Sequence, residues 1–333
     1  MKRQQVEKLG VTGDDTAIGA AASGAASTGA AASQRYTDKV FQSDDGLQLH
    51  YRDHAADSTA DRLPIVCLPG LVGNAREYDH LAQRIAPSRR VLAVDLRGRG
   101  SSEQARDQTG YTIDRHIDDL RQLLEREGIA RAVIIGTSLG GVLAMLLARI
   151  DPFLVAAAVL NEAGPVMGRE GLARNSGGTL QNRSFPTWMH AARALQEAQA
   201  QDHPGWQLDQ WIAHAKRLMS AGGNGRIALD CDSRAGDELH VMEDGLPTVR
   251  NEQSGRAQGA GADWWNVLDA LASCPVLVVR GETSDVLSAA TAQAMVDRLP
   301  DAELLTVRDT GHAPTLNEPV AQAAILRMLE RTD

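Results

Sequence analysis

The sequence predicts an α/β protein with a mostly parallel, eight-stranded sheet, helices on both faces and a helical insertion. Two observations carry this prediction. From Lys39 onward, short apolar runs alternate with amphipathic helical patterns, which is typical of parallel strands joined by crossover helices. The alternation is interrupted once, between about Ala163 and Asp263.

The predicted strands begin with an antiparallel hairpin. The turn Asp44-Asp45-Gly46 joins its two short runs. Six further apolar runs have the length of buried strands and are bounded by turn residues. The eight predicted strands are 40–41, 47–52, 65–68, 91–94, 132–135, 155–160, 276–279 and 303–307.

Helical patterns fill the intervals between these strands. The predicted core helices are 75–85, 114–127, 139–150, 289–299 and 319–329. The interrupted stretch holds two amphipathic segments, 187–199 and 207–219, and no convincing strand, so we expect a helical cap over residues 163–263. The core is then made of residues 36–162 and 264–333.

Residues 1–35 are predicted to be a disordered extension. From Thr16 to Ser33 all residues but Ile18 are Ala, Gly, Ser or Thr, which leaves no apolar stripe to dock on a core. A loosely docked helix is the alternative. No apolar segment typical of a secretory signal follows Lys2 and Arg3.

The composition excludes several classes of partner. The chain of 333 residues has 34 basic and 43 acidic residues and a net charge of −9, so it has no basic surface typical of nucleic-acid or anionic-membrane binding. Its longest apolar stretch, 142–150, is too short to span a bilayer. Cys67, Cys231 and Cys274 are expected to be reduced thiols, which favours the cytoplasm. No metal-ligand spacing such as H-E-x-x-H occurs, and neither a metal nor a cofactor is expected.

A strand, a sharp turn and a helix surround the motif Gly136-Thr137-Ser138-Leu139-Gly140. In this context G-x-S-x-G indicates a nucleophile elbow, a strained turn that holds a serine. Glycine is needed on each side because the turn leaves no room for side chains there. Ser138 is therefore the candidate nucleophile, with capping of the following helix as its alternative role.

A serine nucleophile requires a base and a group that orients the base. His312 is the candidate base because it follows the last strand, whereas the other histidines lie in the hairpin, on helical patterns or in the insertion. Asp285 is the candidate acid, since it lies in the loop after strand 276–279, where ligands gather in open α/β sheets. Glu282 in that loop is its rival, and Asp309 is interpreted as a turn residue.

Acyl transfer also requires backbone donors for the oxyanion of its tetrahedral intermediate. The Leu139 N–H is one candidate, because it begins the helix after Ser138, where the helix dipole favours negative charge. The Leu71 N–H is the second, because Gly70 lets the loop after strand 65–68 turn inward. An ordinary turn at Pro69-Gly70 is the alternative.

Together these motifs resemble the α/β-hydrolase superfamily, from about Val40 to the C-terminus. The segment 95–102, DLRGRGSS, resembles the family's D-x-R-G-x-G-x-S segment, and the region around His312 resembles its histidine loop. Residues 160–165, LNEAGP, resemble the entry to the cap of bacterial members. Pro69 stands where the family more often has histidine. Ser138 and Leu139 disfavour haloalkane dehalogenases, epoxide hydrolases and proline iminopeptidases, which have Asp or Trp at these places.

The resemblance implies hydrolysis of a small carboxylic ester or lactone through an acyl-enzyme on Ser138. C–C bond hydrolysis and acyl transfer use the same three groups and stay open, as do a non-catalytic small-molecule receptor and the oligomeric state. Asn161 and Glu162 lie at the predicted hinge of the cap, and Glu162 is interpreted as structural. Large apolar cap residues are interpreted mainly as packing: Trp188, Met189, Trp206, Trp211 and Met219.

Overall fold

The structure is a computed structural model that describes residues 36–55, 62–175, 178–235, 249–251, 256–258 and 263–332. The predicted extension over residues 1–35 lies outside these ranges, as does part of the predicted cap. In the described part of the chain, no helix has the length and apolar character needed to cross a membrane. Cys67, Cys231 and Cys274 are free thiols.

Eight strands form one sheet in the order β1-β2-β4-β3-β5-β6-β12-β13. Strand β2 pairs antiparallel with β1 and β4, and all other neighbours in this sheet are parallel. The predicted mostly parallel, eight-stranded sheet is therefore confirmed. The strands are β1 (Thr37–Gln42), β2 (Gln48–His54), β3 (Ile65–Leu68), β4 (Val91–Val94), β5 (Ala132–Thr137), β6 (Val155–Asn161), β12 (Val276–Gly281) and β13 (Ala302–Val307).

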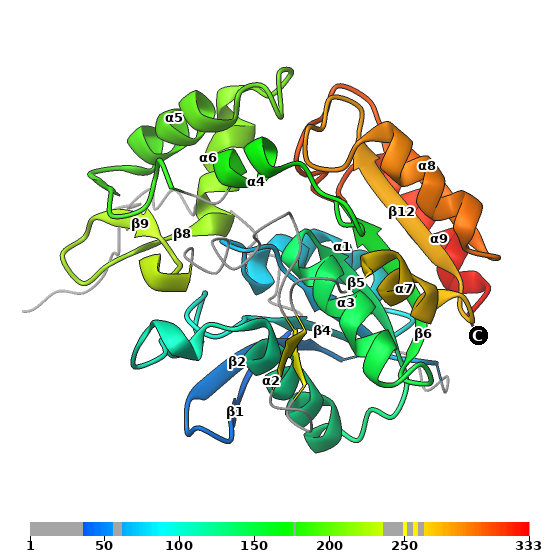
Figure 1. Cartoon of the computed structure of the whole chain (residues 1–333). Helices are drawn as coiled ribbons and strands as arrows, with labels where there is room; N and C mark the ends of the chain where they lie inside the picture. Colours follow the sequence, from blue (N-terminus) through cyan, green and yellow to red (C-terminus); the bar gives the residue numbers. More distant parts are fainter. Residues whose placement is uncertain are drawn as a thin grey trace, which may run out of the picture. The chain divides into compact units, whose positions relative to one another are not determined.

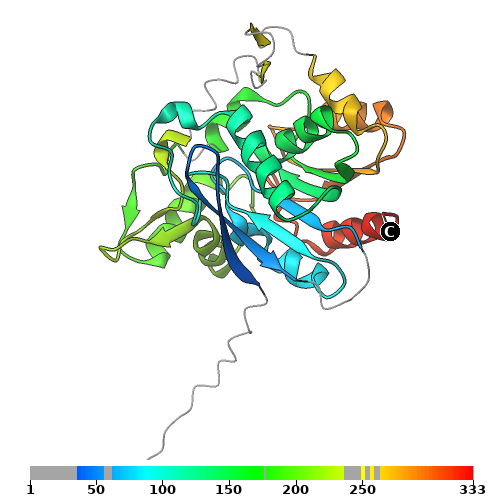
Figure 2. The same cartoon turned by 90° about the horizontal axis from the view of Figure 1, so that it is seen from below.

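Helices cover both faces of this sheet (Figure 2). Successive residues of a strand face opposite sides, so in β3 Val66 and Leu68 join one apolar core while Ile65 and Cys67 join the other. Helices α2 (Ile113–Arg126), α3 (Leu139–Ile150), α7 (Trp264–Leu268) and α8 (Ala289–Arg298) contribute to the first core. Helices α1 (Asp79–Ile85) and α9 (Pro319–Glu330) contribute to the second.

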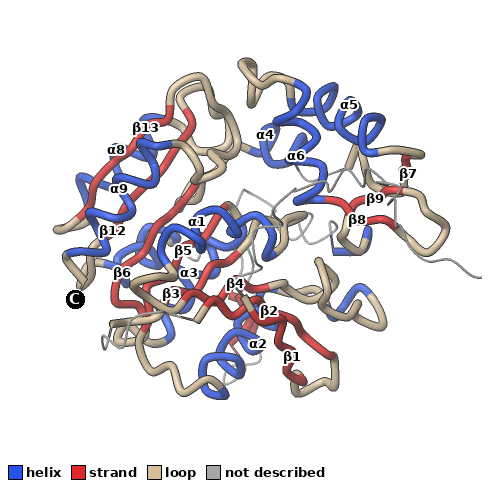
Figure 3. Tube along the Cα trace, turned by 180° about the vertical axis from the view of Figure 1, so that it is seen from behind, coloured by secondary structure: helices blue, strands red, loops and turns tan. Residues whose placement is uncertain are grey.

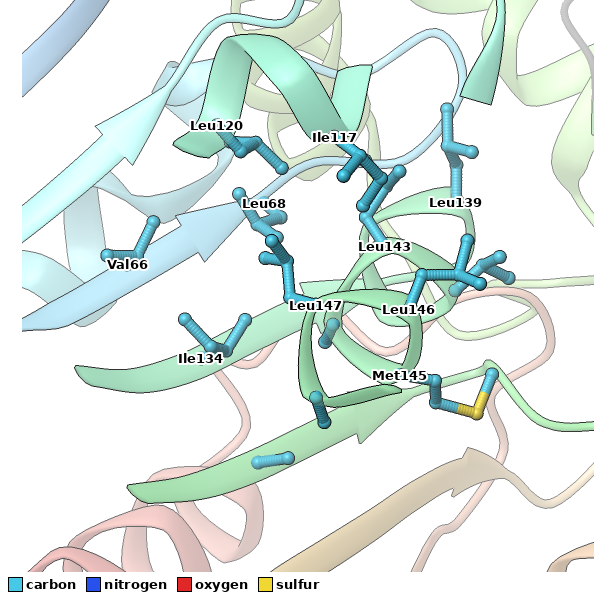
Figure 4. Close-up of a cluster of buried hydrophobic side chains, with 14 of the residues drawn as sticks. Val66, Leu68, Ile117, Leu120, Ile134, Leu139, Leu143, Met145, Leu146 and Leu147 are labelled. Carbon is cyan, nitrogen blue, oxygen red and sulfur yellow. The ribbon is translucent and has the colours of Figure 1, made fainter. Parts of the chain in front are cut away.

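Helix α3 is buried over most of its length in the first core. Every residue from Leu139 to Ala148 is buried, as expected for a helix that is apolar on all sides. Figure 4 shows Leu143 and Leu147 among side chains of the sheet and of α2. Replacing one such leucine with alanine typically costs about 2 to 5 kcal/mol, so the position of the α3 N-terminus is strongly fixed.

The insertion after β6 forms a separate lobe (Figure 1 and Figure 3). Its described helices are α4 (Arg169–Asn175), α5 (Trp188–Gln199) and α6 (Leu208–Leu218). It also contains a small antiparallel sheet, in the order β7-β9-β8, of β7 (Ser184–Phe185), β8 (Met219–Ala221) and β9 (Ile227–Leu229). Strands β10 (Val249–Asn251) and β11 (Arg256–Gln258) form a further pair. The sequence analysis predicted no strand here, because segments of two or three residues are too short to show a period-two pattern.

The insertion is joined to the core by backbone contacts with the DLRGRGSS segment. The Gly100 N–H donates to the Asp230 carbonyl at 2.9 Å, and the Asp232 N–H donates to the Gly98 carbonyl at 2.7 Å. The insertion has its own apolar core, which includes Trp211. Backbone hydrogen bonds therefore hold the insertion against the core, and its own apolar cluster holds the insertion together.

Candidate active site

Ser138 occupies the sharp turn between β5 and α3. Its backbone has φ 51° and ψ −112°, a left-handed conformation that is strained for a serine, and its side chain is 7% exposed. A Cβ on Gly136 would lie 2.3 Å from the Gly140 carbonyl, and a Cβ on Gly140 would lie 2.0 Å from the Leu68 carbonyl oxygen. Only glycine fits these two places, as the motif predicted.

His312 lies in the loop after β13 and lines the same pocket as Ser138. No hydrogen bond between the Ser138 hydroxyl and the imidazole is present in the described part of the chain. Catalytic hydrogen bonds in unliganded sites often form only when substrate binds, so a pocket shared by the two groups is the relevant observation. The backbone N–H of His312 donates to Asp202 Oδ1 at 3.1 Å, and the backbone N–H of Gly311 donates to the Asp202 carbonyl at 2.7 Å. An aspartate of the insertion thereby holds the histidine loop.

The carboxylate at the imidazole is Glu162. Its Oε2 lies 3.2 Å from His312 Nδ1, and the residue is fully buried at the end of β6. The Gly281 N–H donates to Oε1 at 2.6 Å, and the Ser284 hydroxyl donates to Oε2 at 2.5 Å. These donors fix the carboxylate in the orientation that faces the imidazole.

Asp285, the acid expected from the sequence, is placed differently. Its carboxylate is bound by the Arg174 guanidinium of α4, at 2.8 Å for one of the two contacts, and this hydrogen bonding lowers its pKa. Its rival Glu282 accepts a hydrogen bond from the Asp309 N–H at 3.1 Å. Asp309 itself has φ 50°, in agreement with a turn residue. In the described structure none of these three carboxylates hydrogen-bonds to His312.

Sheet order explains why Asp285 and Glu162, which was interpreted from the sequence as structural, both reach the same edge of the sheet. Strand β6 lies between β5, which carries Ser138, and β12, which precedes Asp285. Carboxylates that leave either β6 or β12 therefore reach the same edge of the sheet. The signal in the sequence was the place of Glu162 directly after a buried strand, at the same edge as the elbow.

The two expected oxyanion donors line the pocket together with Ser138 and His312. Leu139 is the first residue of α3, where an N–H has no acceptor within the helix. The Leu71 N–H has no hydrogen-bond acceptor among the described residues. A Cβ on Gly70 would lie 3.7 Å from Ser138 Cβ, so a side chain there would occupy space directly beside the nucleophile.

The pocket is a cavity of about 130 Å³ between the sheet edge and the insertion. The insertion contributes Leu172, Asn175, Gln199, His203, His214, Arg217 and Leu218 to its wall. None of the five large apolar residues singled out in the sequence lines it among the described residues. Trp211 and Met219 lie in the insertion's own core, where they pack against other apolar side chains.

Burial shifts the ionisable groups of this wall. It raises the pKa of Glu77, which lies in the short helix η1 (Ala75–Tyr78), to about 7. Burial lowers the pKa of His203 to about 4 and that of His214 well below its usual value, so both imidazoles are neutral near pH 7. His203 also stacks on Trp206, with ring centroids 3.7 Å apart. Among the described residues, no group of three or more His, Cys, Asp or Glu side chains is arranged to hold a metal ion.

Comparison with known proteins gives consistent matches to one family. Residues 65–325 match the model of the alpha/beta hydrolase family. The 3-hydroxybutyrate-oligomer hydrolase of Cupriavidus necator is 29% identical over 82% of this chain and 89% of its own length. An sn-1-specific diacylglycerol lipase of Mus musculus is 27% identical over 80% of each chain. The crystal structure of an alpha/beta hydrolase from Novosphingobium aromaticivorans is 48% identical, with a TM-score of 0.80 over 89% of this chain and 99% of that one.

Proposed function

Because the chain belongs to the alpha/beta hydrolase family, we propose that it is a serine hydrolase that cleaves a carboxylic ester or lactone. The family and its hydrolase relatives make hydrolysis plausible. The observation that supports the serine mechanism best is the strained turn at Ser138 facing the pocket that also contains His312, with the buried Glu162 carboxylate at the imidazole.

In the proposed reaction Ser138 Oγ attacks the acyl carbonyl while His312 Nε2 accepts the hydroxyl proton. Glu162 keeps the Nδ1–H oriented and stabilises the imidazolium that forms. The Leu71 and Leu139 N–H groups bind the oxyanion. The imidazolium then protonates the leaving alkoxide, and water attacks the acyl-enzyme with His312 as base, which releases the acid and restores Ser138.

In this proposal Glu162 takes the place that the sequence analysis gave to Asp285. Asp285 instead joins a network with Arg174 and Asp202, whose carboxylate also holds the His312 backbone. The insertion would then act as a cap that contributes to the pocket wall, excludes water from the acyl-enzyme and positions the histidine loop.

The first experiment is labelling with a fluorophosphonate probe, followed by turnover of 4-nitrophenyl esters of increasing chain length. We expect one adduct on Ser138, no adduct in Ser138→Ala, and unchanged labelling in the matched control Ser101→Ala, whose side chain is exposed. Equal labelling of wild type and Ser138→Ala would refute the serine mechanism. Labelling of Ser138 without turnover of any ester would favour C–C bond hydrolysis or acyl transfer, and no labelling would favour a receptor.

A further inference from the structure

Arg217 is the one lysine or arginine among the described residues that line the pocket. It is the penultimate residue of α6, in the insertion. The other basic groups of the wall contributed by the insertion, His203 and His214, are held neutral by burial. Among the described residues, the positive charge that the insertion adds to the pocket wall therefore comes from Arg217 alone.

The guanidinium of Arg217 has no partner in the described part of the chain, neither an ion pair nor a hydrogen bond. Its backbone, in contrast, is firmly held. The Asn74 side-chain amide and the Arg76 Nε–H both donate to the Arg217 carbonyl at 2.9 Å. These two residues follow the loop that carries Leu71, so the Arg217 backbone is anchored to the oxyanion loop of the core.

The buried Arg97 shows what full pairing of an arginine with carboxylates looks like. Arg97 donates from Nε and Nη2 to the two carboxylate oxygens of Asp119, each at 2.7 Å, and also contacts Asp45. An arginine placed in a low-dielectric pocket without such a carboxylate loses hydration and gains nothing in return. A planar anion of the same kind would supply the partner that the Arg217 guanidinium lacks among the described residues.

Glu77 is the opposing charge that acts most strongly on Arg217, and it does not fill that role. It lines the same pocket, but the two side chains are not within ion-pair distance. Because burial raises the pKa of Glu77 to about 7, its carboxyl carries a proton for much of the time near neutral pH. The other opposing charges that act on Arg217, Glu318 and Asp79, form no ion pair with it either.

From these contacts we infer that Arg217 binds a carboxylate of the substrate, so that the preferred esters carry a free carboxylic acid group. This inference rests on the proposed ester hydrolysis and adds the substrate class. The planar guanidinium offers two parallel N–H donors that match a carboxylate, and the partly desolvated pocket strengthens the pair. The anchored carbonyl of Arg217 fixes the distance between this anion and the oxyanion loop.

The test compares pairs of esters in which one member carries a carboxylate and the other carries a neutral carboxamide of the same size at the same place. Monoethyl adipate and ethyl adipamate place the group on the acyl side, and 4-carboxyphenyl and 4-carbamoylphenyl butyrate place it on the alcohol side. For each pair, kcat/KM is measured in wild type, Arg217→Gln, Arg217→Lys and Lys216→Gln. Lys216 is the matched control, because it is the neighbouring cation on α6 and is exposed outside the pocket.

We expect wild type to prefer the acid over the amide in at least one pair by about 10- to 100-fold, the range of a charge-assisted hydrogen bond. Arg217→Gln should abolish this preference, because kcat/KM should fall by about 10- to 100-fold more for the acid ester than for the amide ester. Arg217→Lys should keep part of the preference, and Lys216→Gln should keep all of it. An unchanged acid preference in Arg217→Gln, or an equal loss for acid and amide, would overturn the inference.

A binding experiment tests this inference independently of the proposed hydrolysis. Calorimetry with Ser138→Ala measures the affinity for the same four compounds without turnover. Tighter binding of an acid than of its amide, lost when Arg217→Gln is added, supports the carboxylate site even if the chain hydrolyses no ester. Turnover of the amide esters without any acid preference would keep the hydrolase and refute the role of Arg217.

Discussion

Replacing Glu162 with glutamine is the sharpest test of the site geometry. Glutamine keeps the size of the side chain and one oxygen for the Gly281 N–H, but it removes the negative charge at His312. In the proposed reaction that charge acts mainly when the imidazolium forms. The cost should therefore appear in kcat more than in KM.

The expected magnitude follows from the distance of 3.2 Å between Glu162 Oε2 and His312 Nδ1. Two unit charges this far apart at an effective dielectric constant of about 20 attract by about 5 kcal/mol. Since about 1.4 kcal/mol corresponds to a factor of ten in rate, kcat should fall by about 10³- to 10⁴-fold.

The assay is kcat on a 4-nitrophenyl ester, with the thermal melting curve of each variant as the control for folding. Asp285→Asn is the matched variant, because Asp285 pairs with Arg174 and its side chain is 44% exposed. It should retain kcat within about threefold, as surface ion pairs contribute little. A loss in Asp285→Asn as large as that in Glu162→Gln would refute our assignment of the acid.

Three further outcomes follow from the same structure. Gly140→Ala should destabilise the fold by about 3 kcal/mol or more in urea unfolding, because its Cβ would lie 2.0 Å from a backbone oxygen. Gly223→Ala, with open space around it, should be neutral. Equal effects of the two substitutions would contradict the packing argument. Asp202→Ala should lower kcat by about tenfold, because it releases the backbone N–H of His312. Asp202→Asn keeps the acceptor and should stay near the wild-type kcat. Identical kinetics of the two variants would argue against this contact. Burial raises the pKa of Glu77 in the folded state from 4.5 to about 7, so the wild type should lose up to about 3 kcal/mol of stability through this group between pH 4.5 and 8. Glu77→Gln should therefore gain stability relative to the wild type as pH rises. A pH-independent difference between the two proteins in urea unfolding would show that the shift is absent.

Local patterns in the sequence were sufficient for the sheet and for the elbow. Period-two apolar runs and helical spacing predict strands and helices because each pattern follows from the geometry of a single element. The glycines around Ser138 report a turn whose steric demands lie within five residues. The place of His312 after the last strand follows from the order of elements alone.

Only the tertiary structure decided which carboxylate faces His312 and which cation enters the pocket. The sequence indicated Asp285 and interpreted Glu162 as structural. Strands β6 and β12 are neighbours and end at the same edge, and the direction of each side chain depends on partners far away in the chain. Arg174 binds Asp285 from the insertion, and Gly281 and Ser284 orient Glu162 from the next strand and its loop. The lack of a hydrogen-bonding or ion-pairing partner for the Arg217 guanidinium among the described residues likewise depends on all the groups around it, which no local pattern encodes.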